Sequence, residues 1–125
     1  MSAVMERADA ERTWELLKKA ADGLVPAVAV DGADGPVLMV AYQDREAFLA
    51  TMETGAMHYH SRSRGTLWKK GETSGHTQRV LRVRVDCDAD TLLYEIEQTG
   101  AACHTGARSC FYRDIDQLVG KQGRT

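Results

Sequence analysis

Residues 78–98 read QRVLRVRVDCDADTLLYEIEQ, and this stretch contains the clearest strand of the chain. Residues Gln78–Cys87 are predicted to be a strand, because apolar and polar residues alternate from Leu81 to Cys87, as is typical of a half-buried β-strand. The alternation returns in residues 92–98, so DADT (88–91) is predicted to be the turn between two paired strands. On the first strand the alternation separates two faces, one with Leu81, Val83, Val85 and Cys87 and the other with Arg82, Arg84, Asp86 and Asp88.

The rest of the chain extends this hairpin to an α+β fold of mostly antiparallel strands with a few helices. A helix is predicted over 5–21, ending at Asp22-Gly23, and a second over 45–53, with Asp44 as its N-cap and Gly55 as its stop. Further strands are expected at 25–30, 37–42, 57–60 and 67–70.

The length of 125 residues indicates one domain. We expect an N-terminal helical extension over 1–24, a main domain over 25–115 and a C-terminal tail over 116–125, mobile from Gly120 onward. There is no run of about 18 apolar residues, so no membrane partner is expected. The N-terminus lacks an apolar signal core, which favours the cytoplasm. Three cysteines in that reducing compartment favour metal binding or catalysis over disulfides.

The net charge of −2 conceals a local asymmetry. Residues 57–85 hold seven basic side chains against one acid, whereas residues 86–97 hold five acids and no base. This arrangement suits a phosphate-bearing ligand beside a metal site. Two solvated strand faces that attract each other would explain it equally well.

Three aspartates, Asp86, Asp88 and Asp90, alternate along the end of the predicted strand. A straight strand would hold neighbours about 7 Å apart, too far for all three to bind one ion. A curl of the backbone at Ala89 would bring the carboxylates together as ligands for a hard cation such as Mg²⁺. A polar hairpin turn without a metal is the alternative. An EF-hand loop is excluded because Thr91 stands where such a loop needs glycine.

The segment CHTGARSC places six residues between Cys103 and Cys110, with His104 beside the first. Together with Cys87, these thiols could hold zinc and leave one position open for water, as catalytic sites do. Cys87 has the opposite strand parity to the aspartates, so it must serve a different site or be a core thiol. His104 is placed to ligate or to act as a general base, unless it is a surface histidine.

The segment HSRSRGTLWKKGETSG (60–75) combines hydroxyls, cations and glycines, which are the groups that bind phosphates. An alternative function is a zinc-stabilised nucleic-acid-binding module, which would use the basic loop 61–75 and stack bases on Trp68 and Tyr59. The acidic composition counts against this alternative.

Together, SRSRGTLWKKGETSG (61–75), DCDAD (86–90) and ACHTGARSCFYR (102–113) resemble the phosphoribosyl-AMP cyclohydrolase family, the ring-opening enzymes of histidine biosynthesis. VLMVAYQDREAF (37–48) is similar to the family's opening segment, and the resemblance covers roughly residues 25–115. The chain corresponds to the monofunctional form. One departure is His60, which stands where the family has an aromatic residue.

The resemblance implies an intertwined homodimer that needs Zn²⁺ and Mg²⁺. Zinc would be bound by Cys103 and Cys110 of one subunit and Cys87 of the other, and magnesium by Asp86, Asp88 and Asp90. The implied reaction is hydrolysis of the N1–C6 bond of phosphoribosyl-AMP, the third step of histidine biosynthesis. No nucleic-acid partner is expected.

The mechanism that we hypothesise has zinc-bound hydroxide attacking C6, with His104 as the catalytic residue that moves protons. The substrate-binding residues implied are Ser61, Arg62, Ser63, Arg64, Trp68, Lys70, Glu72, Thr73 and Ser74.

Overall fold

The computed structural model describes residues 2–120 and has the predicted α+β fold. Four strands form a sheet in the order β2-β1-β6-β5, and the other two form a separate hairpin. Every pair of neighbours is antiparallel except β1 and β6, which run parallel. The strands are β1 (Val25–Asp31), β2 (Val37–Gln43), β3 (His58–Ser61), β4 (Thr66–Lys69), β5 (Gln78–Val85) and β6 (Leu92–Gln98). All six expected strands are therefore confirmed, each to within two residues.

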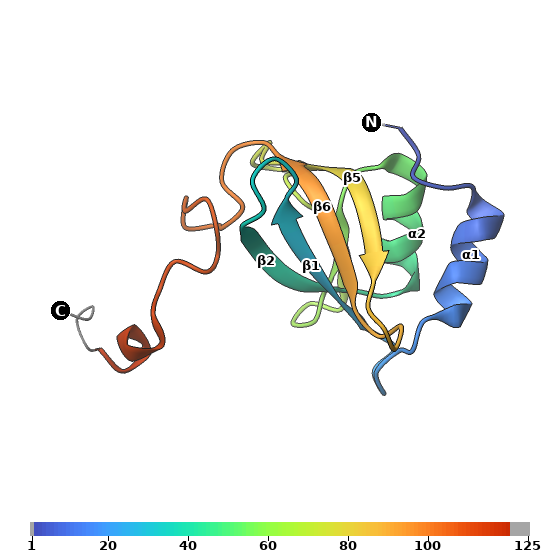
Figure 1. Cartoon of the computed structure of the whole chain (residues 1–125), viewed down its shortest axis with the longest axis horizontal. Helices are drawn as coiled ribbons and strands as arrows, with labels where there is room; N and C mark the ends of the chain where they lie inside the picture. The colour runs from blue at the N-terminus through green and yellow to red at the C-terminus, as the bar shows by residue number, and fades with distance from the viewer. Residues whose placement is uncertain (1, 121–125) are drawn as a thin grey trace.

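Two helices, α1 (Arg7–Leu16) and α2 (Arg45–Thr54), lie on one side of the sheet (Figure 1). The aromatic rings of Trp14 and Phe48 join them, with 5.5 Å between centroids. The inward residues of the two central strands are buried, among them Ala27, Ala29 and Tyr94. Burial of this apolar layer stabilises the fold, and small alanines on β1 let the covering elements approach the sheet closely.

Helix α2 follows its predicted signals. The backbone N–H of Ala47 donates to Oδ1 of Asp44, the N-cap, over 2.9 Å. Gly55 ends the helix in the left-handed region, with φ at 74°, where a glycine avoids the steric cost of a side chain. The other oxygen of Asp44 lies 3.2 Å from Nδ1 of His60, so a polar contact occupies the position where the family resemblance predicts an aromatic residue.

The expectation of a helix over 5–21 is wrong at its C-terminal end, because α1 stops at Leu16. Leu17 adopts an extended conformation and is buried in the core. The next residue, Lys18, donates its backbone N–H to the carbonyl oxygen of Ala89, 2.8 Å away. These long-range contacts end the helix, and the predicted stop at Asp22-Gly23 is part of a turn instead.

The predicted faces of strand β5 also need correction. A register shift between Val80 and Arg82 marks a bulge, so Val80 and Val83 both pack against the core while Leu81 is exposed. The strand ends at Val85, so Cys87 lies in the turn and is exposed, not a core thiol. The premise that strand parity separates Cys87 from the aspartates is therefore wrong.

The outer face of the β5–β6 hairpin explains part of the charge asymmetry. Arg79 pairs with Glu97 at 3.2 Å, and Arg84 pairs with Glu95 at 2.8 Å, across neighbouring strands. Arg79 and Arg84 therefore pair with acids of the neighbouring strand. This agrees with the interpretation of the charge asymmetry as two solvated strand faces that attract each other. No helix among the described residues is long and apolar enough to cross a membrane.

Candidate active site

A cavity of about 650 Å³ opens between the β3–β4 hairpin, the loop that follows β4 and the loop that follows β6. One wall carries hydroxyls and cations, and the other carries the first cysteine and its neighbouring histidine. Most of the predicted site residues are brought together here, although they come from two separate segments of the chain, residues 61–74 and 103–104. The predicted residues lining it are Ser61, Ser63, Arg64, Trp68, Lys70, Glu72, Thr73, Ser74, Cys103 and His104.

Arg62 is the predicted substrate-binding residue that the cavity lining does not include. Its guanidinium carbon lies 4.0 Å from the centre of the Tyr42 ring, in a cation–π contact. Arg62 lies in the β3–β4 turn, directly after the last residue of β3, and its contact with Tyr42 directs it to β2. The assignment of Arg62 to the binding site therefore finds no support in the cavity.

Sequence reasoning missed Thr66 and His76, which line the cavity together with Lys69. His76 directly follows Gly75, the last residue of the segment that was predicted to bind phosphates. Its ring lies so close to Gly100 that a side-chain carbon at Gly100 would fall 2.5 Å from Cδ2. This approach joins loops on either side of β5 and β6, and only the tertiary structure reveals it.

The cysteine loop, residues 102–110, holds the thiols of Cys103 and Cys110 close enough for each to shift the pKa of the other. The hydroxyl of Thr105 donates to Sγ of Cys103 over 3.0 Å, and this bond lowers the pKa of the Cys103 thiol. Partial burial and the nearby Cys103 sulfur raise the pKa of Cys110. The pair therefore offers two adjacent sulfur ligands, of which Cys103 ionises first, a donor set that suits a soft cation such as zinc.

Lys70 connects the end of β4 to this loop. Its ammonium group donates to the carbonyl oxygen of Ala102, immediately before Cys103, and lies 5.7 Å from the centre of the Trp68 ring. Burial lowers the pKa of Lys70, while the two thiols oppose the shift. Lys70 thus places a positive charge beside the sulfur atoms.

A second set of contacts anchors the other side of the cysteine loop. The guanidinium of Arg108 binds Oδ2 of Asp31 at 2.7 Å and Oδ1 of Asp34 at 2.9 Å, in the β1–β2 turn. The backbone N–H of Cys110 donates to the carbonyl oxygen of Leu38 over 2.7 Å. The loop is therefore held at the edge of the sheet formed by β2.

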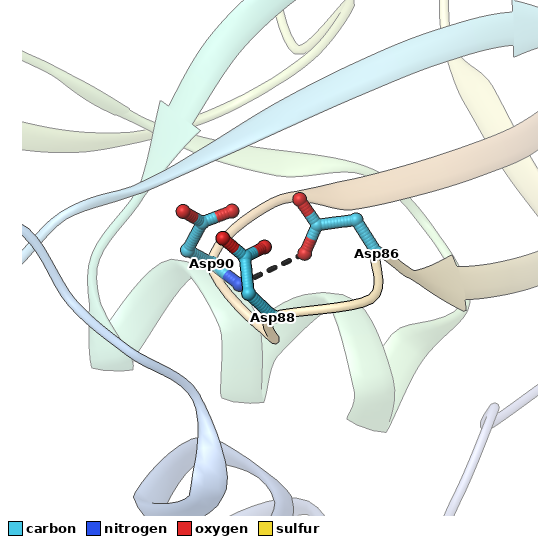
Figure 2. Close-up of side chains that lie close together, drawn as sticks. All are labelled: Asp86, Asp88 and Asp90. Carbon is cyan, nitrogen blue, oxygen red and sulfur yellow. Dashed lines mark hydrogen bonds between the residues drawn. The ribbon is translucent and has the colours of Figure 1, made fainter.

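The aspartate cluster confirms the predicted curl. Carboxylate oxygens of Asp86, Asp88 and Asp90 all lie within 4.8 Å of one another (Figure 2). Ala89 adopts φ of 61°, a left-handed conformation that is costly for alanine and folds the turn back. The backbone N–H of Asp90 donates to Oδ1 of Asp86 at 2.9 Å, which fixes the turn.

The pKa values of this cluster diverge. The hydrogen bond with Asp86 raises the pKa of Asp90. For Asp86, desolvation opposes ionisation, but hydrogen bonds from Asp90 and Thr91 outweigh it and lower the pKa. Like charges held this close disfavour full ionisation of the cluster, and a divalent cation would relieve their repulsion. The oxygen donors therefore fit a hard cation such as Mg²⁺.

Cys87 is not brought to the cavity of its own chain. It lies in the turn before β6, whereas Cys103 and Cys110 follow the other end of that strand. Seven residues of extended strand separate the two ends by roughly 20 Å. A single chain cannot supply all three cysteines to one ion.

Comparison with known proteins agrees with these features. Residues 39–112 match the family model described as Phosphoribosyl-AMP cyclohydrolase. A protein of that name from Haloquadratum walsbyi is 64% identical over 95 residues, 76% of this chain and 72% of the relative. Another, from Haloarcula marismortui, is 61% identical over 99 residues, 78% of this chain and 82% of the relative.

A longer relative from Deinococcus radiodurans, named Histidine biosynthesis bifunctional protein HisIE, is 60% identical over 93 residues, 74% of this chain and 43% of the relative. These matches give no support to the alternative of a nucleic-acid-binding module. The matched segment includes the β3–β4 hairpin, the aspartate turn and the cysteine loop. The chain therefore belongs to the phosphoribosyl-AMP cyclohydrolase family.

Proposed function

We propose that this chain is a metal-dependent hydrolase that opens the adenine ring of phosphoribosyl-AMP at the N1–C6 bond, a step of histidine biosynthesis. The names of its relatives support this substrate. The observation that carries the proposal is the cavity itself, in which a wall of hydroxyls and cations faces Cys103 and His104. Such a cavity suits a purine that carries phosphates at two ends.

The hydroxyl and cation wall would bind the phosphates. Ser61, Ser63 and Arg64 come from the β3–β4 turn, and Thr73 and Ser74 come from the loop after β4. Hydroxyls and an arginine fork provide charge-assisted hydrogen bonds to phosphate oxygens. Binding at both ends of the substrate would hold the purine ring between them.

Trp68 and Glu72 would orient the remaining parts of the substrate. The Trp68 ring packs on Tyr59, with 5.2 Å between centroids, so its position is set by a fully buried neighbour. A fixed aromatic ring in the cavity wall can stack on the purine. Glu72 offers its carboxylate to hydroxyl groups of a ribose.

Zinc would be held by Cys103 and Cys110 of one chain and by Cys87 of a second copy. The adjacent thiols fit the metal, and the position of Cys87 at the far end of β6 requires a homodimer for the third ligand. When bound there, zinc would lower the pKa of a water molecule to about 7.

His104 would move the protons of the reaction. It follows Cys103 in the sequence and lines the same cavity. The ring would accept a proton from the attacking water as the oxygen bonds to C6, and would donate one to N1 as the N1–C6 bond breaks. The product keeps a carboxamide at C6.

Magnesium would be held by Asp86, Asp88 and Asp90. These residues surround Cys87 in the turn, so a second copy that supplies Cys87 to the cavity would bring the aspartates with it. The cation would then lie beside the substrate phosphates and offset their charge.

The test is a spectrophotometric assay of phosphoribosyl-AMP turnover, with and without a chelator. We expect Cys110→Ser to lose zinc and activity, whereas Ser109→Ala, its matched neighbour, keeps both. His104→Ala should retain zinc but turn over about 10²–10⁴-fold more slowly. Full activity of a metal-free Cys110→Ser protein would end the zinc proposal, and an unchanged rate for His104→Ala would remove that residue from the mechanism.

A further inference from the structure

The C-terminal arm, residues 111–119, carries large apolar side chains that the described part of its own chain leaves in solvent. Phe111 is 63% exposed, Ile115 72%, Leu118 65% and Val119 74%. In Figure 1 the arm runs away from the body of the molecule, past the edge formed by β2. Apolar residues concentrated on a projecting segment indicate a surface that another molecule covers.

The arm is already ordered for such a contact. Residues Ile115–Val119 form a 3₁₀ helix, η1, in which Ile115 and Leu118 lie on the same side because they are three residues apart. The side-chain oxygen of Gln117 accepts the backbone N–H of Asp114 at 2.7 Å and closes the turn. A segment with a fixed shape loses little conformational freedom when it docks.

A matching apolar groove of about 260 Å³ lies beside β5, at the sheet edge opposite β2. Its lining combines the end of α1, the end of β5 and the turn after β5, with Leu16, Leu17, Val83, Val85 and Ala89 among its residues. Leu16 is 78% exposed and Val85 is 52% exposed, so apolar side chains of the groove are also open to solvent.

The arm and the groove of one chain are badly placed to meet. The arm leaves the body where Cys110 is bound to Leu38 of β2, and the groove adjoins Val85 of β5. β2 and β5 are opposite edges of the four-stranded sheet. A second copy removes this obstacle, because a two-fold axis lets each chain give its arm and receive the other.

The proposed zinc site would bring the arm and groove of two copies together, and on this point the inference rests on the proposed function. Val85 and Ala89 of the groove flank Cys87 in the sequence, and the arm begins directly after Cys110. If Cys87 of one chain meets Cys110 of another, the arm emerges beside the groove of that first chain.

We infer that the C-terminal arm of each chain docks its apolar residues into the groove between α1 and β5 of a second copy. The exchanged arms cover both sets of exposed apolar side chains. They also hold the loop that carries Cys110 against the turn that carries Cys87. Docking of the arm therefore brings the two halves of the active site together.

Photo-crosslinking of the full chain tests the contact directly. Ile115 is replaced by p-benzoylphenylalanine, and the ¹⁵N-labelled variant is mixed with unlabelled wild-type protein before irradiation. We expect mass spectrometry to find crosslinks from labelled arm peptides to unlabelled groove peptides containing Leu16 or Val85. Crosslinks confined to the groove of the same chain, or crosslinks only elsewhere, would overturn the inference.

Dilution series in the analytical ultracentrifuge give a second measurement. Ile115→Asp and Leu16→Asp alter exposed side chains and should each raise the dimer dissociation constant about tenfold or more. Val40→Asp, on the exposed face of β2, is the matched control and should leave it unchanged. Dissociation by Val40→Asp alone would place the contact on the sheet face. Crosslinks without turnover would contradict only the proposed function, and turnover without these crosslinks would contradict only the arm contact.

Discussion

At the scale of single residues, two arginines of the β3–β4 turn are predicted to have different roles, one in binding the substrate phosphates and one in the structure. Arg64 lines the cavity, whereas Arg62 stacks on Tyr42. We expect Arg64→Ala to raise KM for phosphoribosyl-AMP about 10–100-fold, because a charge-assisted hydrogen bond contributes about 1.5–3 kcal/mol. Arg62→Ala should change KM less than threefold. Steady-state kinetics check both variants, and equal effects would contradict the division of roles.

The aspartate cluster makes a prediction about cation binding. Asp88→Asn should weaken Mn²⁺ binding at least tenfold, because it removes one of three charged oxygen ligands. Glu97→Gln removes an acid outside the cluster and is the control. Because the hydrogen bond with Asp86 raises the pKa of Asp90, binding to the wild type should weaken as the pH falls toward that pKa. Titration followed by electron paramagnetic resonance measures both effects, and pH-independent binding would argue against this site.

At the scale of elements, the β5–β6 turn depends on the left-handed conformation at Ala89. Ala89→Val should destabilise the protein by about 1–2 kcal/mol and weaken Mn²⁺ binding, because a β-branched residue is strained at φ near 61°. Ala89→Gly accepts this conformation and should preserve cation binding. Urea unfolding and Mn²⁺ titration of the pair provide the measurements. Unchanged cation affinity in Ala89→Val would show that the turn does not arrange the carboxylates.

The contact between the cysteine loop and the β1–β2 turn predicts a pH-dependent stability. The backbone N–H of Ala33 and the guanidinium of Arg108 lower the pKa of Asp31 below its ordinary value of 3.8. A lowered carboxyl pKa stabilises the fold above that value and loses its contribution as the pH falls through the folded-state pKa. Asp31→Asn should therefore cost about 1 kcal/mol of unfolding free energy at pH 7 and progressively less below pH 4.

Urea unfolding at several pH values between 7 and 3 measures this difference, with the more exposed Asp34→Asn as the control. A cost for Asp31→Asn that stays constant across this range would mean that the charge of Asp31 plays no part.

The elements that were predicted correctly have their determining residues within their own segment of the sequence. Helix α2 has its cap residue and its glycine stop in the sequence, and β6 alternates without interruption. The end of α1 and the bulge in β5 were missed because both depend on contacts with distant residues. Leu17 turns into the core, and the register of β5 is set by pairing with β6.

The site residues also fall into those that the sequence indicates and those that only the folded chain reveals. Runs of hydroxyl, basic and cysteine residues identified most of the cavity lining, since each run is contiguous in sequence. They did not show that Arg62 points elsewhere or that His76 joins the cavity, because side-chain direction and the approach to Gly100 arise only in the folded chain.

At the scale of the whole molecule, the sheet separates two groups of ligands. The cysteine loop lies at one end of β6, and the turn with Cys87 and the aspartates lies at the other. The chain also leaves an apolar arm and an apolar groove uncovered. The proposed unit of two chains, with active sites formed between them, would explain both observations.

Paired heterodimers test this account most directly. The chains carry different affinity tags, are co-expressed and are purified through both tags, and zinc content and turnover are then measured. A heterodimer of Cys87→Ser with Cys103→Ser should retain one intact site, with half the wild-type turnover and one zinc ion per dimer. Wild type paired with the double variant Cys87→Ser/Cys103→Ser should retain neither site. The reverse pattern, with the first pair inactive and the second half-active, would contradict a zinc site shared between chains.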